Sequence, residues 1–361
     1  MFRAISFRLI TVLFSLLIAA LFAEAALRIF TPSRLRYANG ERNFFCRFDH
    51  ELGWAPLENI TGAQDINNTK FIVHQNHFGL RGPDDMQLKK TPGRKRVLVL
   101  GDSYVWGLGV DQERIFSEPA VHGTNDEIIN FGVSGYGNDQ EYLFYLRKGK
   151  DFDVDQVALA FTPYNDIENN TNSVQYSHLK PYFTLDRGQL VLHDDHVRDT
   201  KARSFFDRLN RQSLTYNLAG EGFRQLIDFL VPPRPKRWKP ENVTDSDRAG
   251  IELTLAIFKK LKEAVEAHNA EFYVVFIPYT PHIQKNLPDN HPFVPLIAAG
   301  LTQMGVHYRE PYPEFLKAAA RSIHPFNDPD NHFSPAGHAL FAKFVTDTEE
   351  ARASTDYYAR H

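Results

Sequence analysis

The sequence contains a single cysteine, Cys46, among its 361 residues. An internal disulfide and a cysteine-based zinc site are therefore both excluded. A surplus of positive charge is also missing, because 41 Lys and Arg stand against 44 Asp and Glu. The chain therefore lacks the electrostatic footprint of a nucleic-acid-binding protein. With 43% hydrophobic and 24% charged residues, the composition excludes a disordered chain, a collagen-like repeat and a polytopic membrane protein.

Glycine-rich nucleotide-binding loops are absent as well. The pairs Gly107-x-Gly109 and Gly135-x-Gly137 lack the third glycine of a dinucleotide loop, and no Walker-type Gly-Lys-Ser occurs. Residues 193–196 combine two histidines with two aspartates, but in this polar stretch a solvated loop is the better interpretation than a metal site. The sequence thus predicts neither a cofactor nor a metal.

The longest apolar run occupies residues 9–23 and follows Arg3 and Arg8. As a helix it spans about 22 Å, short of a hydrocarbon core of roughly 30 Å. Extension to residue 30 reaches spanning length but takes in two charged residues. One interpretation is a secretory signal cleaved near Ala23-Glu24-Ala25, and the other, which we favour, is an uncleaved signal anchor. Both send the remainder of the chain across the membrane.

Short apolar runs alternate with helical stretches after residue 94, which is typical of a parallel sheet covered on both faces. The predicted strands are residues 97–100, 128–129, 157–161, 272–277 and 306–308, and the main predicted helices are 138–148, 246–269 and 292–303. The fold class predicted is α/β, a three-layer sandwich around a central, mainly parallel five-stranded sheet. In such a fold the carboxyl ends of the strands, and any site they form, share one edge.

Four segments make up the predicted organisation. Residues 1–30 form the signal anchor or signal peptide, residues 31–93 an N-terminal extension that packs on the core, and residues 94–350 the main domain, with an insertion at 163–245. Near the end of the extension, Arg81 stands between two glycines in a predicted tight loop. There it either orients a carboxylate or is solvated.

The insertion contains three recognisable parts. A hairpin is predicted around residues 186–189 and a helical piece near 204–231. The proline-rich basic run at 232–240 is too stiff and too charged for a core element. It suits either a contact with an anionic lipid or polymer, or a solvated linker, and the linker is the simpler interpretation.

A serine directly follows the first predicted strand, in the run Gly101-Asp102-Ser103. Nucleophilic serines occupy this place in α/β hydrolases, after a glycine that permits a sharp turn. The nucleophile elbow Gly-x-Ser-x-Gly is not present, because position 105 is Val. Taken alone, the tripeptide is better explained by Ser103 acting as a helix N-cap.

A base and its orienting group stand near the far end of the chain. His332 precedes Ser334-Pro335, a strong start signal for a helix. Asp330 lies two residues before it, so an Asp-x-His turn can hold one imidazole nitrogen and leave the other for a serine proton. The alternative is a surface histidine paired locally with Asp330. His338, inside the predicted helix, suits packing or hydrogen bonding better than catalysis.

Two further strand ends carry groups that suit an oxyanion hole. Gly135 follows the second strand and offers a backbone N–H, and Asn165 follows the third and offers a side-chain amide. Both residue types are also ordinary in turns. The aromatic residues Trp106, Tyr136 and Tyr164 flank these groups. Their rings can stack on a sugar, or they simply pack the bases of the loops.

Together these blocks resemble the SGNH (GDSL-like) hydrolase superfamily, and the similarity runs from about residue 94 to about residue 344. The resemblance implies a flavodoxin-like sandwich with Ser103 as nucleophile, His332 as general base and Asp330 as its orienting group. It also implies an oxyanion hole made by the Ser103 N–H, the Gly135 N–H and the Asn165 amide. The third block usually reads Gly-x-Asn-Asp, whereas here it reads Pro163-Tyr164-Asn165-Asp166.

The function expected from this resemblance is hydrolysis of an acyl ester through an acyl-Ser103 intermediate, with an O-acylated envelope glycan or a small ester as substrate. Because Asp-x-His is similar to the block found in SGNH-type polysaccharide O-acetyltransferases, transfer to a sugar is an open alternative. A non-catalytic glycan-binding protein on the same fold is a third. With its N-terminal membrane segment, the chain resembles bacterial envelope members, either anchored in the inner membrane or secreted to the periplasm. No nucleic-acid partner is expected.

Overall fold

The computed structural model of the chain describes residues 2–30, 45–66, 69–176, 178–197, 213, 215, 243–328 and 330–360. It divides into two compact units. One comprises residues 1–44 and 199–237, and the other comprises residues 45–198 and 238–361. Apart from residues 213 and 215, the predicted helical piece near 204–231 and the basic run at 232–240 lie outside the described residues.

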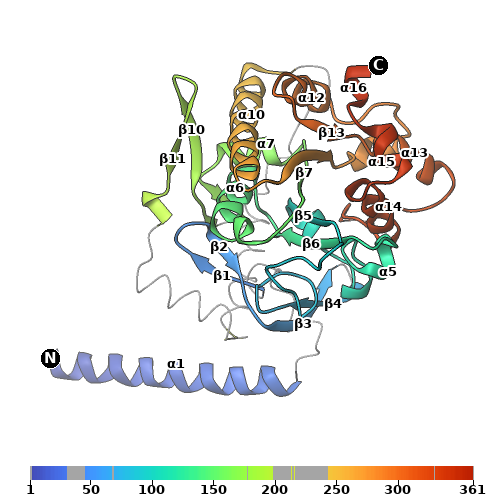
Figure 1. Cartoon of the computed structure of the whole chain (residues 1–361). Coiled ribbons are helices and arrows are strands. Elements are labelled where there is room, and N and C mark those ends of the chain that lie inside the picture. Colours follow the sequence, from blue (N-terminus) through green and yellow to red (C-terminus); the bar gives the residue numbers. More distant parts are fainter. Residues whose placement is uncertain are drawn as a thin grey trace. The chain divides into compact units, whose positions relative to one another are not determined.

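Five parallel strands form the central sheet of the larger unit (Figure 1). They are β5 (Arg96–Gly101), β6 (Glu127–Gly132), β7 (Gln156–Phe161), β12 (Glu271–Phe276) and β13 (His307–Arg309). The spatial order is β6-β5-β7-β12-β13, which numbered along the chain is the flavodoxin-like order 2-1-3-4-5. Each strand overlaps one of the predicted apolar runs, so the predicted fold class is confirmed.

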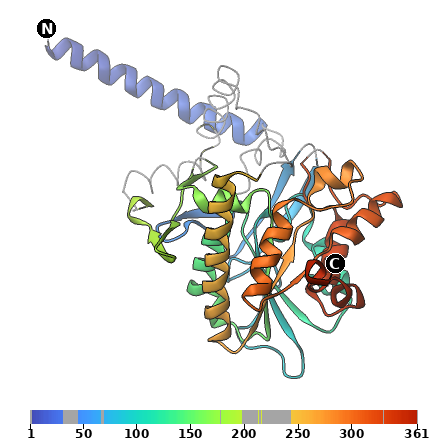
Figure 2. The ribbon, with the colours of Figure 1, turned by 90° about the horizontal axis from the view of Figure 1, so that it is seen from above.

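Helices cover both faces of this sheet, and the strands are therefore buried on both sides. In β5, Leu98 and Leu100 pack into one apolar cluster, while Val97 and Val99 pack into the other. The first cluster is closed by α6 (Asn138–Arg147), α10 (Asp245–Glu266) and α12 (Phe293–Gln303), and the second by α13 (Tyr312–Ala320) and α14 (Pro335–Val345). In Figure 2 the long gold helix α10 lies alongside the strands.

Short elements connect these layers. The α-helical ones are α4 (Ser103–Trp106), α5 (Pro119–His122), α7 (Asp166–Thr171), α11 (Thr280–Gln284), α15 (Glu349–Ser354) and α16 (Tyr357–Arg360). Single 3₁₀ turns occur at η1 (Gln112–Arg114), η2 (Gly149–Asp151) and η3 (Asp195–Val197).

Two antiparallel hairpins precede the sheet. They are β1 (Cys46–Asp49) with β2 (Gly53–Pro56), and β3 (Ile60–Ile66) with β4 (Thr69–Gln75). The first is tied to the turn after β6, since the Trp54 indole N–H donates to the Ser134 carbonyl at 3.2 Å and the Tyr136 hydroxyl donates to the Trp54 carbonyl at 2.6 Å. An ion pair between Arg147 of α6 and Asp49 adds a second anchor.

The insertion contributes two more hairpins, β8 (Val174–Gln175) with β9 (His178–Leu179), and β10 (Tyr182–Asp186) with β11 (Gln189–His193). The predicted turn at 186–189 is confirmed, because Asp186 pairs with Gln189 across it. Arg187 and Gly188 both have positive φ, 49° and 78°. Two such residues give the tight turn that matches the twist of paired strands.

In the smaller unit, helix α1 (Phe2–Phe30) carries the apolar N-terminal run. Its segment Ile10–Leu27 is long and apolar enough to cross a membrane, and a signal sequence meets the same criteria. Near the end of this segment the Glu24 carboxylate accepts hydrogen bonds from the Ser213 hydroxyl and the Thr215 N–H, both at 2.9 Å.

A buried polar layer lies at the start of α6, where the first four side chains are fully buried. The Asn138 amide donates to the carboxylates of Glu141 and Asp166 and thereby links α6 to α7. Asp139 forms an ion pair with Lys180, and both side chains are completely enclosed. Burial raises the pKa of Asp139 and lowers the pKa of Lys180, so desolvation opposes both charges of this pair.

Replacing Lys180 by Met is expected to lower the free energy of unfolding by about 3–5 kcal/mol, because it leaves the Asp139 carboxylate buried without its partner. Urea denaturation of the full chain in mild detergent measures the loss. Lys317→Met is the control, since Lys317 forms an exposed pair with Glu314 and its removal should leave the midpoint unchanged. A wild-type midpoint for Lys180→Met would show that the buried pair does not stabilise the fold.

Candidate active site

The candidate site lies where the strand order reverses. The chain passes from β5 to β6 on one side of β5 and returns to β7 on its other side, so the strand order reverses between β5 and β7. Ser103 follows β5 and Asn165 follows β7. Ligands of open α/β sheets bind at such a position.

The turn after β5 presents Ser103 at the first position of α4. A Cβ at Gly101 would approach the Val105 side chain to 2.3 Å, so the turn requires a glycine. The N-cap of α4 is Asp102, whose carboxylate accepts the Tyr104 N–H at 2.9 Å. Since Asp102 caps the helix, the capping role considered for Ser103 is not needed, and the Ser103 hydroxyl remains available for other chemistry.

The Ser103 hydroxyl contacts a histidine from the opposite end of the sequence. Its Oγ lies 2.8 Å from Nε2 of His332, 229 residues away. His332 stands on the loop before α14, whose N-cap Ser334 accepts the Gly337 N–H as the sequence predicts. The His332 side chain keeps about 20% exposure, so the pair is accessible from solvent. A hydroxyl and an imidazole nitrogen at this distance can exchange a proton.

Asp330 lies beside His332 without a hydrogen bond to the ring. Its carboxylate accepts the backbone N–H of His332 at 3.0 Å, and its nearest oxygen stands 3.8 Å from Nδ1. Nδ1 itself is buried and makes no hydrogen bond to the described residues. The Asp330 carboxylate of the expected Asp-x-His turn therefore binds the backbone N–H of His332 here, and Asn331 between the two residues has a left-handed φ of 64°.

The turn after β7 brings Asn165 next to the nucleophile turn. One N–H of its side-chain amide is bound to the Asp102 carboxylate at 3.1 Å, which the Thr162 hydroxyl also contacts at 3.2 Å. Burial raises the pKa of the Asp102 carboxyl, while the hydrogen bonds from Asn165, the Tyr104 N–H and Thr162 act against that rise. Asp102 thus ties the Ser103 turn and the Asn165 turn together.

Gly135 lies in the loop after β6. Strand register pairs Gly132 with Gly101, and the Val133 N–H continues the ladder to the Gly101 carbonyl at 3.0 Å. The chain then turns, with Gly135 at a φ of 80° that favours glycine. Gly135 and Ser103 therefore follow neighbouring strand ends, three residues beyond Gly132 and two residues beyond Gly101.

The structure differs from the sequence-based expectation for two of the three flanking aromatic residues. Trp106 is 3% exposed and Tyr136 is fully buried, so neither ring has a free face for a sugar. The Trp106 indole donates to the Gln75 side chain and packs against Phe45, while Tyr136 is bound to Trp54 as described above. Both rings are covered by the hairpins of residues 45–75.

Arg81 has a role that neither sequence interpretation anticipated. Its side chain is fully buried and donates to the carbonyls of Trp106, Gly107 and Val110, at 3.0, 2.7 and 3.0 Å. Burial lowers its pKa to about 9, a shift that the charges of Glu118 and Asp111 partly oppose. Arg81 thus fixes the loop that leaves α4. Only its position between two glycines hinted at this in the sequence.

His338 is a packed residue, in line with the sequence-based expectation. Its ring stacks on Phe116, and its Nδ1 accepts the Phe116 N–H at 3.4 Å. Burial, followed by the charges of Arg81 and His332, lowers its pKa to about 3. His338 therefore stays neutral in the folded chain.

The low pKa of His338 predicts a loss of stability in acid. As pH falls below about 6.5, the unfolded chain binds this proton and the folded chain does not, until about pH 3. Between about pH 7 and pH 5, the wild type should lose about 2 kcal/mol more unfolding free energy than His338→Asn. Urea denaturation across this range measures the difference, and parallel curves for the two proteins would contradict the prediction.

No metal centre is found among the described residues, since no three His, Cys, Asp or Glu side chains there are arranged to hold an ion. The histidines of the polar run 193–196 have other contacts. His193 lies 2.8 Å from the Thr184 hydroxyl, and His196 lies 2.8 Å from the Lys180 carbonyl.

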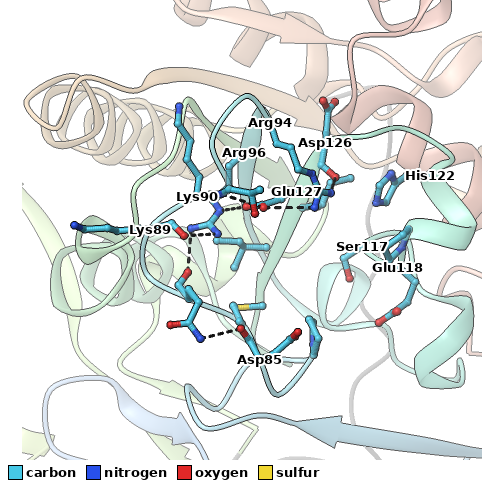
Figure 3. A pocket seen from close by; sticks show the side chains of 18 of the residues that line it. Asp85, Lys89, Lys90, Arg94, Arg96, Ser117, Glu118, His122, Asp126 and Glu127 are labelled. Carbon is cyan, nitrogen blue, oxygen red and sulfur yellow. Dashed lines mark hydrogen bonds and ion pairs between the residues drawn. The ribbon is translucent and has the colours of Figure 1, made fainter.

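A cavity of about 510 Å³ lies at the opposite edge of the sheet, by the amino ends of β5 and β6 (Figure 3). Most of the Lys and Arg side chains that line this cavity form ion pairs or hydrogen bonds with neighbouring groups. Arg96 pairs with Glu127, Lys90 pairs with Asp155, and Arg94 donates to backbone carbonyls before β6. The polar side chains of this cavity thus stabilise the fold, whereas Ser103 and His332 lie at the other edge of the sheet.

The comparisons with known proteins find a likeness among solved structures. No protein-family model matches the sequence, and no curated protein matches it. Among solved structures, a crystal structure of TesA is similar over 69% of this chain and 96% of its own, with 12% sequence identity and a TM-score of 0.36.

Proposed function

We propose that the protein is a serine-dependent acyl ester hydrolase that works through an acyl-Ser103 intermediate. The observation that carries the proposal is the 2.8 Å contact between the Ser103 hydroxyl and Nε2 of His332, two residues far apart in sequence that meet at the switch point of the sheet. The same residues support membership of the SGNH (GDSL-like) hydrolase superfamily.

The chemistry proceeds in two halves. His332 Nε2 takes the Ser103 proton as Oγ attacks the ester carbonyl, and the alcohol leaves with that proton. A water molecule then attacks the acyl-serine with His332 again as base. The Asp330 carboxylate, 3.8 Å from Nδ1, favours the imidazolium that forms in each half. Catalytic contacts such as the one between the Asp330 carboxylate and Nδ1 of His332 often shorten only when substrate is bound.

The oxyanion would be held by the N–H groups of Ser103 and Gly135 and by the amide of Asn165. One Asn165 N–H is bound to Asp102, which orients the amide and leaves its second N–H for the substrate oxygen. The amide is therefore preorganised before the charge develops.

The substrate class we propose is an O-acylated envelope glycan or a small ester. Transfer of the acyl group to a sugar hydroxyl is the second candidate, because the Asp330-Asn331-His332 spacing is similar to that of SGNH-type polysaccharide O-acetyltransferases. Both reactions share the acyl-Ser103 step and differ in what accepts the acyl group. The apolar segment Ile10–Leu27 suits a chain anchored in, or exported through, a bacterial inner membrane.

The proposal is tested by turnover of p-nitrophenyl acetate by the full chain in mild detergent, with and without added glycan acceptors. Release of p-nitrophenol supports ester hydrolysis, and acetylated glycan in the products would instead support transfer. A folded wild-type protein that releases no p-nitrophenol under either condition would favour a glycan-binding protein on a hydrolase fold.

Replacing Asn165 by Ala is expected to lower kcat by about 10²-fold, the usual cost of one oxyanion donor. Asn172→Ala, at the far end of the same helix α7, is the control and should keep wild-type kcat. Steady-state kinetics on p-nitrophenyl acetate give both values. A fully active Asn165→Ala would remove Asn165 from the oxyanion hole.

A further inference from the structure

Two tyrosine hydroxyls connect the sequence neighbours of the proposed reacting groups. Tyr104 follows the nucleophile, Tyr164 precedes the amide donor and Asn331 precedes the base. The Tyr104 hydroxyl donates to the Asn331 carbonyl at 2.9 Å and lies 2.5 Å from the Tyr164 hydroxyl. Helix α4, the turn after β7 and the loop before α14 are thus joined by one path of hydrogen bonds.

The direction of this path follows from the number of protons. A phenol has one hydrogen to donate, and a backbone carbonyl can only accept. Tyr104 therefore gives its hydrogen to Asn331, and Tyr164 gives its hydrogen to the Tyr104 oxygen. Burial raises the pKa of both tyrosines, so both hydroxyls keep their protons. Tyr164 consequently acts on Asn331 only through Tyr104.

Asn331 is a residue whose conformation needs support. Its φ of 64° is left-handed, a region that Asn tolerates better than most residues but at a cost. The Thr280 hydroxyl donates to the same carbonyl at 3.2 Å, and the Gln284 amide donates to the Asn331 side chain at 3.1 Å. Because this carbonyl belongs to the peptide that continues into His332, its direction sets where the imidazole points.

The Tyr104 ring also supports the imidazole directly. The ring centroids of Tyr104 and His332 lie 4.9 Å apart. The buried Tyr104 side chain thus contacts the base through its ring and the carbonyl of the residue before the base through its hydroxyl. The Tyr104 N–H donates to Asp102, which caps the helix of the nucleophile.

We propose that Tyr104 and Tyr164 are positioning residues that hold His332 against Ser103 by pinning the Asn331 carbonyl. The inference rests on the proposed acyl-transfer function. It assigns Tyr164 a role other than a stacking platform for sugars, since its hydroxyl is committed to Tyr104. Neither tyrosine needs to touch the substrate for this role.

The test compares Tyr104→Phe, Tyr164→Phe and the double variant. Tyr104→Phe should lower kcat on p-nitrophenyl acetate by about 10- to 100-fold with little change in KM, because the base is displaced while the binding surface is kept. Tyr164→Phe should lower kcat less. The double variant should be no slower than Tyr104→Phe, because the two hydroxyls act in series.

Two further variants separate positioning from stability. Tyr273→Phe removes an equally buried hydroxyl, which donates to the Val345 carbonyl at 2.8 Å away from the site. It should lower the melting temperature as Tyr104→Phe does while keeping wild-type kcat. Thr280→Val removes the second donor to the Asn331 carbonyl and should lower kcat in the same direction, which keeps the test open if Tyr104→Phe does not fold.

A fluorophosphonate probe distinguishes failure of this inference from failure of the proposed function. Its rate of attachment to Ser103 reports the activated hydroxyl without any natural substrate. If the wild type neither reacts with the probe nor hydrolyses the ester, the proposed function is wrong and the inference falls with it. If the wild type and Tyr104→Phe react with the probe equally fast, the proposed function stands and the positioning role is wrong. The same conclusion holds if the losses of kcat in the two single variants multiply in the double variant.

Discussion

Replacing Ser103 by Ala is expected to abolish turnover of p-nitrophenyl acetate, with a loss of about 10³-fold or more in kcat. The substitution deletes the one atom that forms the acyl bond and leaves His332 with nothing to deprotonate. The fold should survive, because the cap of α4 is the Asp102 carboxylate and the Ser103 carbonyl keeps its bonds to the Gly107 and Leu108 N–H groups.

The matched control is Ser117→Ala. Ser117 lies outside the candidate site, and its buried hydroxyl makes no hydrogen bond to the described residues. This variant should keep wild-type kcat and a wild-type melting curve. A folded Ser103→Ala that retains a tenth or more of wild-type kcat would rule out Ser103 as the nucleophile.

Replacing His332 by Ala should lower kcat on p-nitrophenyl acetate by a similar factor, again about 10³-fold or more. Without the imidazole, the Ser103 hydroxyl has no base at 2.8 Å, and nothing returns a proton to the leaving alcohol. The variant should also change the pH profile. In the wild type, kcat/KM should rise with pH, because only an imidazole without its proton can act as the base. The residual rate of His332→Ala should lack that rise.

His324→Ala provides the control for this experiment, because His324 is an exposed histidine outside the Ser103 contact. It should keep both the wild-type rate and the wild-type pH profile. A rise with pH that persists in His332→Ala would assign the titrating base to another residue.

The sheet and its long helices could be predicted from the sequence because their signals are local. The run Val97–Leu100 is apolar at every position, as a strand buried on both faces requires, and the structure extends it by only one residue at each end. Ser334-Pro335 predicted the start of α14 for an equally local reason, since the cap and the first-turn proline are adjacent.

Burial of the aromatic residues could not be predicted, because it depends on segments far away in the chain. Trp106 and Tyr136 lie next to the motif residues, and only the hairpins of residues 45–75 decide that their rings are covered. The same holds for Arg81, whose carbonyl partners lie 25 or more residues further along the chain. Sequence proximity to a reacting group is therefore weak evidence that a side chain touches the substrate.

The Asp330–His332 geometry depends on a single backbone angle. A two-residue spacing permits the carboxylate to reach either the imidazole or the backbone N–H of His332, and the left-handed Asn331 selects the N–H. The sequence places both residues on one loop but does not state that angle. Likewise, Gly101-Asp102-Ser103 leaves open which side chain caps α4, and the answer, Asp102, leaves the Ser103 hydroxyl to contact His332.

The most direct test of the central claim is to trap the acyl group on Ser103. The full chain is mixed with p-nitrophenyl acetate, quenched in acid during turnover and digested, and the peptides are examined by mass spectrometry. Our account predicts one acetyl group on the peptide that contains Ser103, lost again when hydrolysis is allowed to finish and absent from Ser103→Ala. Steady release of p-nitrophenol with no acetyl group on that peptide at any time would contradict it.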